Sequence, residues 1–129
     1  MKRNINDNQF KGKKFWGPPI WTTIHILAAT LRPEDADAYE MFLESLTRLL
    51  PCDICRQNLI YKLKHYPPAP YLKNNEDAFF YSYFLHDMVN ESASGKEGKV
   101  RESPPYEDVK IWYFDKLSQE CEGCKLSHV

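Results

Sequence analysis

The apolar residues of this 129-residue chain recur at helical spacing, and no stretch of useful length alternates as a β-strand would. The first apolar stripe predicts a helix over residues 20–31, which follows a Gly-Pro-Pro turn and ends before Pro33. The widest apolar face predicts a second helix over residues 35–50. That face consists of Tyr39, Phe42, Leu43, Leu46, Leu49 and Leu50.

Three further helices are predicted after Pro51, which interrupts the apolar pattern. The third covers residues 52–65, with Cys55 on its inner face and Cys52 at the rim. The fourth, over residues 75–92, follows Asn74 as its N-cap and is apolar nearly all round, so it should be buried on most sides. A short fifth helix begins near Ser103, its expected cap. The pattern therefore predicts an all-α protein, a four-helix bundle with an additional short helix.

The segments outside this pattern are short. Residues 1–14 are basic and polar without an apolar run, so we expect a flexible N-terminal arm rather than a secretory signal. Residues 119–129 have no apolar period and are expected to form a flexible tail, which leaves 15–118 as the single domain. The net charge of −1, with both signs interspersed, argues against a nucleic-acid surface, and no apolar run is long enough to span a membrane.

All four cysteines fall in two Cys-x-x-Cys pairs, Cys52/Cys55 and Cys121/Cys124. At the first turn of a helix, unpaired N–H groups and the helix dipole favour the thiolate, which is the reactive form of cysteine. This favours a redox dithiol, while two ligands of a structural zinc site are the alternative that spacing alone leaves open. A four-cysteine zinc site would join pairs that are much further apart than the roughly 15–20 residues of zinc ribbons. A thioredoxin fold is disfavoured because its strands are missing.

Two helical stripes combine aromatic and polar side chains. They contain Trp21 and His25 on the first predicted helix, and Phe79, Tyr83, His86 and Asn90 on the fourth. Such stripes are usually core, but buried His and Asn side chains need partners, because an unpaired buried polar group costs about 1–3 kcal/mol. The partners are either other helices or a polar heteroaromatic ligand. A dithiol that passes electrons to oxygen needs a two-electron cofactor, and a flavin is suited to this role.

On these residues the chain resembles the Erv/ALR family of FAD-linked sulfhydryl oxidases over residues 16–112. The matching motifs are Trp21-Thr22-Thr23-Ile24-His25, Pro51-Cys52-Asp53-Ile54-Cys55 and His86-Asp87-Met88-Val89-Asn90. The three occur in order and at fitting separations, which is more specific than any one of them. The lead-in at residues 16–18 and the short N-terminus resemble the compact members encoded by large DNA viruses.

The resemblance implies that FAD lies in the mouth of the bundle, with Cys55 beside the flavin and Cys52 as the interchange sulfur. The candidate cofactor-binding residues are Trp16, Trp21, His25, Cys55, Asn58, Phe79, Tyr83, His86, Asn90, Lys96, Lys99 and Trp112. Among them, Lys96 or Lys99 is expected to face the phosphates of FAD. No metal ligand is expected.

The resemblance also implies a thiol oxidase, usually a homodimer, that forms disulfides in protein dithiols and reduces O₂ to H₂O₂. Cys121 and Cys124 are interpreted as a shuttle to the active pair Cys52/Cys55, fed by a protein dithiol or a thioredoxin-like relay protein. The expected compartment is the host cytoplasm or virion for a viral protein, and otherwise the mitochondrial intermembrane space. The alternative hypothesis is a non-catalytic, zinc-stapled helical adaptor.

Overall fold

The computed structural model describes residues 11–97 and 102–118, and every regular element in this part of the chain is helical. Its α-helices are α1 (Lys13–Ala29), α2 (Ala36–Leu49), α3 (Asp53–His65), α4 (Asn75–Glu97) and α5 (Tyr106–Ser118). Two 3₁₀ turns, η2 (Pro33–Asp35) and η3 (Ala69–Tyr71), lie in the connections after α1 and α3. The predicted all-α class is confirmed. None of the described helices is both long and apolar enough to cross a membrane.

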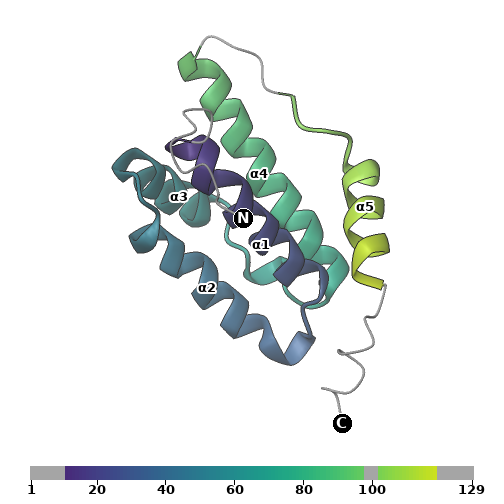
Figure 1. Ribbon diagram of the computed structural model, residues 1–129. Coiled ribbons are helices and arrows are strands. Elements are labelled where there is room, and N and C mark those ends of the chain that lie inside the picture. The colour runs from purple at the N-terminus through teal and green to yellow at the C-terminus, as the bar shows by residue number, and fades with distance from the viewer. Residues whose placement is uncertain (1–10, 98–101, 119–129) are drawn as a thin grey trace, which may run out of the picture.

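The helices associate as two pairs with a fifth helix alongside (Figure 1). Helix α1 packs chiefly on α4, α2 packs chiefly on α3, and α5 lies against α1 and α4. Buried hydroxyls tie the pairs together: Tyr39 donates to the Ile24 carbonyl at 3.1 Å, and Tyr81 donates to the Tyr66 carbonyl at 2.6 Å. The predicted bundle with an additional short helix is therefore the observed arrangement.

Helix α1 begins at Lys13, so the turn predicted at residues 16–19 is wrong: Pro18 and Pro19 lie inside the helix. Gly12 has the left-handed φ of 56° that glycine adopts readily, and its carbonyl accepts two amide N–H bonds at 2.9 and 3.1 Å. Trp16, in the added segment, packs against the core. Tertiary packing thus outweighs the local tendency of two prolines to interrupt a helix.

The apolar face of α2 differs from the prediction at one position. Leu43 is fully buried, whereas Leu49 is 72% exposed. Leu49 is the last residue of α2, and the backbone leaves the helical conformation at Leu50. The predicted face was one residue too wide.

Helix α4 starts as predicted, because the Asp77 amide donates to Asn74 Oδ1 at 2.8 Å. It continues to Glu97, beyond its predicted end at residue 92. The expectation of burial on most sides holds for a core stripe that includes Phe79 and Leu85, while Phe80 is 43% exposed.

Ser103 does not cap α5, which begins only at Tyr106. Its hydroxyl instead donates to Asp87 Oδ1 at 2.7 Å and accepts a bond from Asn90 Nδ2 at 3.0 Å. Because both partners lie on α4, Ser103 fixes the segment before α5 to the bundle.

Candidate active site: a dithiol beside a cationic cavity

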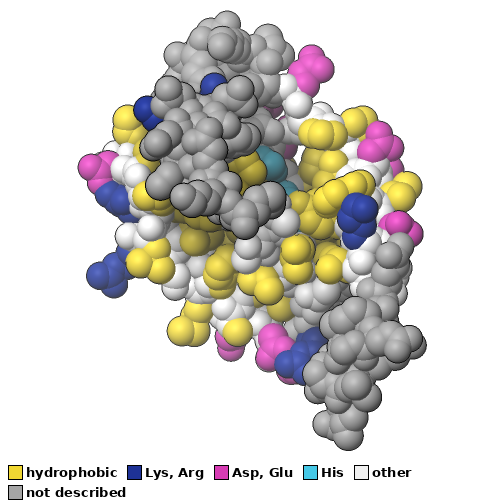
Figure 2. Space-filling model, viewed as in Figure 1, with side chains coloured by type: hydrophobic (Ala, Val, Ile, Leu, Met, Phe, Trp, Pro, Cys, Tyr) yellow, Lys and Arg dark blue, Asp and Glu magenta, His cyan; other side chains and the backbone are white. Residues whose placement is uncertain are grey.

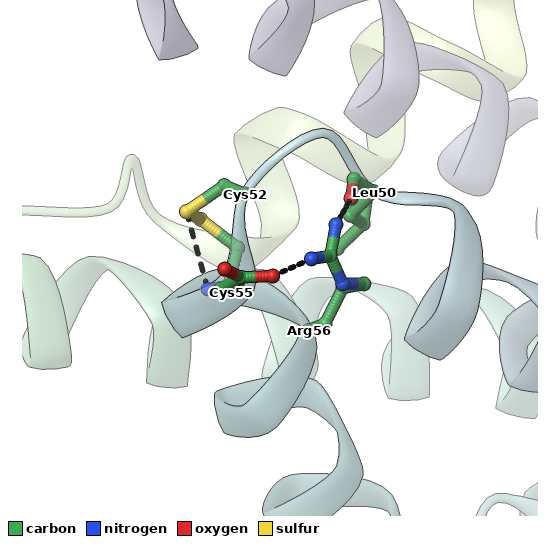
Figure 3. Close-up of a disulfide and its surroundings, with 5 residues drawn as sticks. Leu50, Cys52, Cys55 and Arg56 are labelled. Atoms are coloured by element: carbon green, nitrogen blue, oxygen red, sulfur yellow. Dashed lines mark hydrogen bonds and ion pairs between the residues drawn. A yellow bond between two sulfur atoms is a disulfide. The ribbon is translucent and has the colours of Figure 1, made fainter.

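Cys52 and Cys55 form a disulfide at the start of α3, with their Cα atoms 5.2 Å apart (Figure 3). Cys52 is the N-cap, and its Sγ accepts a hydrogen bond from the Cys55 amide at 3.2 Å. Both residues are half-buried. When the pair is reduced, this amide and the positive end of the helix dipole stabilise negative charge on Cys52.

Arg56 holds the turn that carries the dithiol. Its guanidinium donates to the Leu50 carbonyl and pairs with Asp53, one residue after Cys52 (Figure 3). These contacts join the end of α2 to the first turn of α3. Arg56 was not predicted as a site residue, although the spacing of three residues between Asp53 and Arg56 is typical of an ion pair on a helix.

A cavity of about 970 Å³ is lined by residues of all five described α-helices, and Cys55 forms part of its wall whereas Cys52 does not. Figure 2 shows histidine side chains (cyan) set back among apolar side chains on this side of the molecule. The inward position predicted for Cys55 agrees with this geometry. One sulfur of the disulfide therefore meets the cavity, and the other lies outside its lining.

Most of the candidate cofactor-binding residues come together in the wall of this cavity. They are Trp16, Trp21, His25, Cys55, Asn58, Tyr83, His86 and Asn90. Lys99, Cys121 and Cys124, together with the side chain of Lys96, lie outside the described residues. The tail pair and the lysines expected at the phosphates thus stay predictions.

Two candidates lie elsewhere. Phe79 is fully buried and packs against Phe114 with ring centroids 5.3 Å apart, so it belongs to the core behind the cavity wall. Trp112 is 53% exposed, and Lys116 lies over its ring on the outer face of α5. The neighbouring Tyr113 lines the cavity in its place. The helix period explains why Tyr113 and not Trp112 faces the cavity, because consecutive residues of a helix point about 100° apart.

Every charged residue in the described lining is a lysine: Lys11, Lys13, Lys14 and Lys62. Lys62 is only 7% exposed, and its Nζ donates to Ser92 Oγ at 3.1 Å. Positively charged side chains in the wall of a cavity favour an anionic ligand. Residues 11–14 were predicted to belong to a flexible arm. Lys62 was not predicted at the site, although it lies two helical turns after Cys55.

His25 and His86 meet at the cavity wall, with Nε2 of His25 3.1 Å from Nδ1 of His86. Trp21 stacks on the His86 ring at a centroid distance of 4.0 Å and an interplanar angle of 6°. Burial, together with the smaller effect of the nearby His86, lowers the pKa of His25 to about 4. Burial also lowers the pKa of His86 to about 4, against the opposing effect of Asp87. Both imidazoles are therefore neutral near pH 7.

We expect the protein to lose stability as the pH falls below about 6.5. In this range His25 and His86 bind protons in the unfolded chain but stay neutral in the folded protein, where they are buried. Because both pKa values are lowered to about 4 in the folded protein, the unfolded state binds more protons between these limits. Urea unfolding midpoints should therefore be lower at pH 5 than at pH 7. In a His86→Gln variant the difference should shrink, and equal midpoints for the unmodified protein would contradict the assignment.

The described residues contain no group of three or more His, Cys, Asp or Glu side chains placed to hold a metal ion. The alternative four-cysteine zinc site would need Cys121 and Cys124, outside the described part of the chain. The cavity that the structure does describe has aromatic walls and cationic side chains, which suit a planar, negatively charged nucleotide better than a metal ion.

This geometry defines a class: a helical bundle whose dithiol borders an aromatic, cationic cavity. The sequence model of the Erv1/Alr family matches residues 18–110, and this range includes all three motifs. The chain belongs to the Erv1/Alr family. Membership in this family supports the assignment of the protein to the sulfhydryl oxidases. Members of the family typically bind FAD. A search of curated protein sequences finds no match.

Proposed function

We propose that this protein is an FAD-dependent thiol oxidase that forms disulfide bonds in protein substrates and reduces O₂ to H₂O₂. The observation that carries the proposal is the position of Cys55. Its disulfide with Cys52 borders a cavity whose described charged residues are all lysines. The family match points to the same class of enzyme.

The residues of the cavity fit FAD. Trp21, His25 and His86 line the cavity with flat rings that suit the aromatic parts of the dinucleotide, and the lysines offer positive charge for its two phosphates. Lys62 is the most buried of them, at 7% exposed, so water screens its charge the least. When bound, FAD accepts two electrons from a dithiol and passes them to oxygen.

The thiol chemistry follows from the placement of the two sulfurs. A substrate thiolate attacks Cys52 Sγ, the Cys52–Cys55 bond breaks, and Cys55 leaves as the thiolate at the cavity wall. The second substrate thiolate then attacks the substrate sulfur bound to Cys52, so the substrate disulfide forms and Cys52 is released. The two electrons of the substrate now reside on the reduced Cys52/Cys55 pair. Overall, R(SH)₂ + O₂ → R(S–S) + H₂O₂.

The substrate side of the proposal rests on sequence. Cys121 and Cys124 act as a shuttle that takes electrons from a protein dithiol or thioredoxin-like relay protein and delivers them to Cys52. In a homodimer the delivery crosses between the subunits. The proposed compartment is the host cytoplasm or virion for a viral protein, and otherwise the mitochondrial intermembrane space.

The test is the absorbance spectrum of the purified protein together with its oxygen consumption. We expect a yellow protein with bound FAD that consumes O₂ and produces H₂O₂ when dithiothreitol is added. The stoichiometry should be one O₂ per dithiol oxidised. A colourless protein that contains one zinc ion per chain and unfolds with chelator would instead establish the non-catalytic adaptor.

A further inference from the structure

Ser82 is a buried hydroxyl on α4 that belongs to none of the sequence motifs. Its side chain is fully buried, its Oγ donates to the Phe79 carbonyl at 2.7 Å, and the same oxygen lies 2.8 Å from Nδ1 of His25. A hydroxyl has only one proton to donate. Because that proton goes to the Phe79 carbonyl, Ser82 can only accept from His25. Nδ1 of His25 therefore carries a proton.

The protonated Nδ1 of His25 determines the next hydrogen bond. In the neutral imidazole only one nitrogen carries a proton, so Nε2 of His25 is an acceptor. This Nε2 lies 3.1 Å from Nδ1 of His86, and the bond forms only if His86 donates. Neutral His86 then has its proton on Nδ1 and a lone pair on Nε2.

Nε2 of His86 is the ring nitrogen left without a partner among the described residues. His86 lines the cavity, and the stacked ring of Trp21 holds its plane. Every buried side-chain nitrogen or oxygen of the described residues has a hydrogen-bond partner. Since none of those residues bonds to Nε2 of His86, this atom is accessible rather than buried. It is an acceptor in a lining whose described charged groups, the lysines, are all donors.

We propose that Ser82 is a positioning residue that acts through His25. It fixes the proton on Nδ1 of His86 and so presents the Nε2 lone pair to an N–H or O–H donor of bound FAD. The proposal rests on the proposed function for the identity of the ligand. FAD offers such donors in the imide of its ring system, its adenine amino group and its hydroxyls.

Removal of the Ser82 hydroxyl should reverse the chain of hydrogen bonds. Nδ1 of His25 loses its acceptor, so the His25 proton moves to Nε2 and donates to Nδ1 of His86. His86 must then carry its proton on Nε2. An N–H group would face the donor of the ligand, and two donors cannot bond each other.

The first measurement is the ¹⁵N NMR spectrum of the histidine rings in the full-length protein freed of FAD. For the unmodified protein we expect the Nδ1–H tautomer at both His25 and His86. Ser82→Ala should convert both to the Nε2–H tautomer. The matched control is Ser45→Ala, which removes a hydroxyl that also bonds a helix carbonyl, that of Met41 at 2.8 Å, on the exposed surface of α2. It should leave both tautomers unchanged.

The second measurement is the dissociation constant of FAD, obtained by fluorescence titration of the same proteins. Ser82→Ala should weaken binding about 10-fold, the scale expected when a donor in a buried contact loses its acceptor. Ser45→Ala should bind as the unmodified protein does. Ser82→Thr, which restores a hydroxyl, should recover the Nδ1–H tautomers.

Unchanged tautomers in Ser82→Ala would overturn the proposal, as would changed tautomers with unchanged FAD affinity. Failure of the unmodified protein to bind FAD would refute the proposed function separately. In that case the positioning role of Ser82 would be judged from the histidine tautomers of the FAD-free proteins alone. A change from Nδ1–H to Nε2–H in Ser82→Ala would support this role, and the absence of the change would overturn it.

Discussion

Replacement of Cys55 by serine should reduce the rate of dithiothreitol oxidation by at least about 1000-fold, as expected when the nucleophile of a covalent mechanism is removed. Cys55 contributes the sulfur of the disulfide that lines the cavity, so under the proposed function it is the one through which electrons leave the dithiol. Serine keeps the size of the side chain but forms no disulfide. The FAD content should be unchanged, because Cys55 contributes one side chain to a wall of many. Oxygen consumption and absorbance at the flavin band measure the two quantities.

The matched control is Cys121→Ser, which removes the same atom from the other pair. It should oxidise dithiothreitol at the normal rate, since this small substrate reaches Cys52 directly, but should oxidise a protein dithiol more slowly. Full activity of Cys55→Ser would show that the dithiol at α3 is not the redox centre. Full activity of Cys121→Ser towards a protein substrate would remove the shuttle from the proposal and leave the active pair intact.

The position of Cys55 is a case in which the sequence was sufficient. The spacing of Cys55, Leu59 and Leu63 places them on one face of a helix, and Pro51 marks where that helix begins. A short-range periodicity and a local start signal were enough, because both depend only on helix geometry. For the same reason the order of the helices, both ends of α2 and α3, and the start of α4 were predicted correctly.

The start of α1 was not predictable in this way. Pro18 and Pro19 are a valid signal for a turn, yet both lie inside α1, whose Trp16 packs against the core. The consequence for the site is large. The lysines at 13 and 14 belong to the cavity wall rather than to a flexible arm.

The hydrogen-bond partners of His25 and His86 were also beyond the sequence. The need for partners was clear from two polar side chains on buried stripes, but their choice of each other and of Ser82 depends on how α1 packs against α4. Ser82 has no periodic or motif signal, because a single small polar residue on a buried helix is common. Only the distances identify its role.

Replacement of Phe79 by alanine should destabilise the fold by about 3–5 kcal/mol, the usual cost of truncating a fully buried aromatic side chain. Phe79 is fully buried, and its ring lies 5.7 Å from that of His25, 5.5 Å from Tyr113 and 5.3 Å from Phe114. It therefore joins α4 to both α1 and α5. Since a domain of this size is stable by only about 5–15 kcal/mol, the loss should be a large part of the total.

The sequence placed Phe79 among the cofactor contacts, and the experiment separates that role from a core role. Phe80→Ala is the matched control, because Phe80 is the next residue of the same helix and is 43% exposed. It should cost about 1 kcal/mol or less. Urea unfolding of the FAD-free, disulfide-bonded proteins gives both values, and Phe79→Leu provides a milder truncation in case Phe79→Ala does not fold. A core residue lowers stability without the cofactor, whereas a contact residue lowers it only when FAD is present. If Phe79→Ala matched Phe80→Ala in the FAD-free protein but bound FAD more weakly, Phe79 would be a cofactor contact after all.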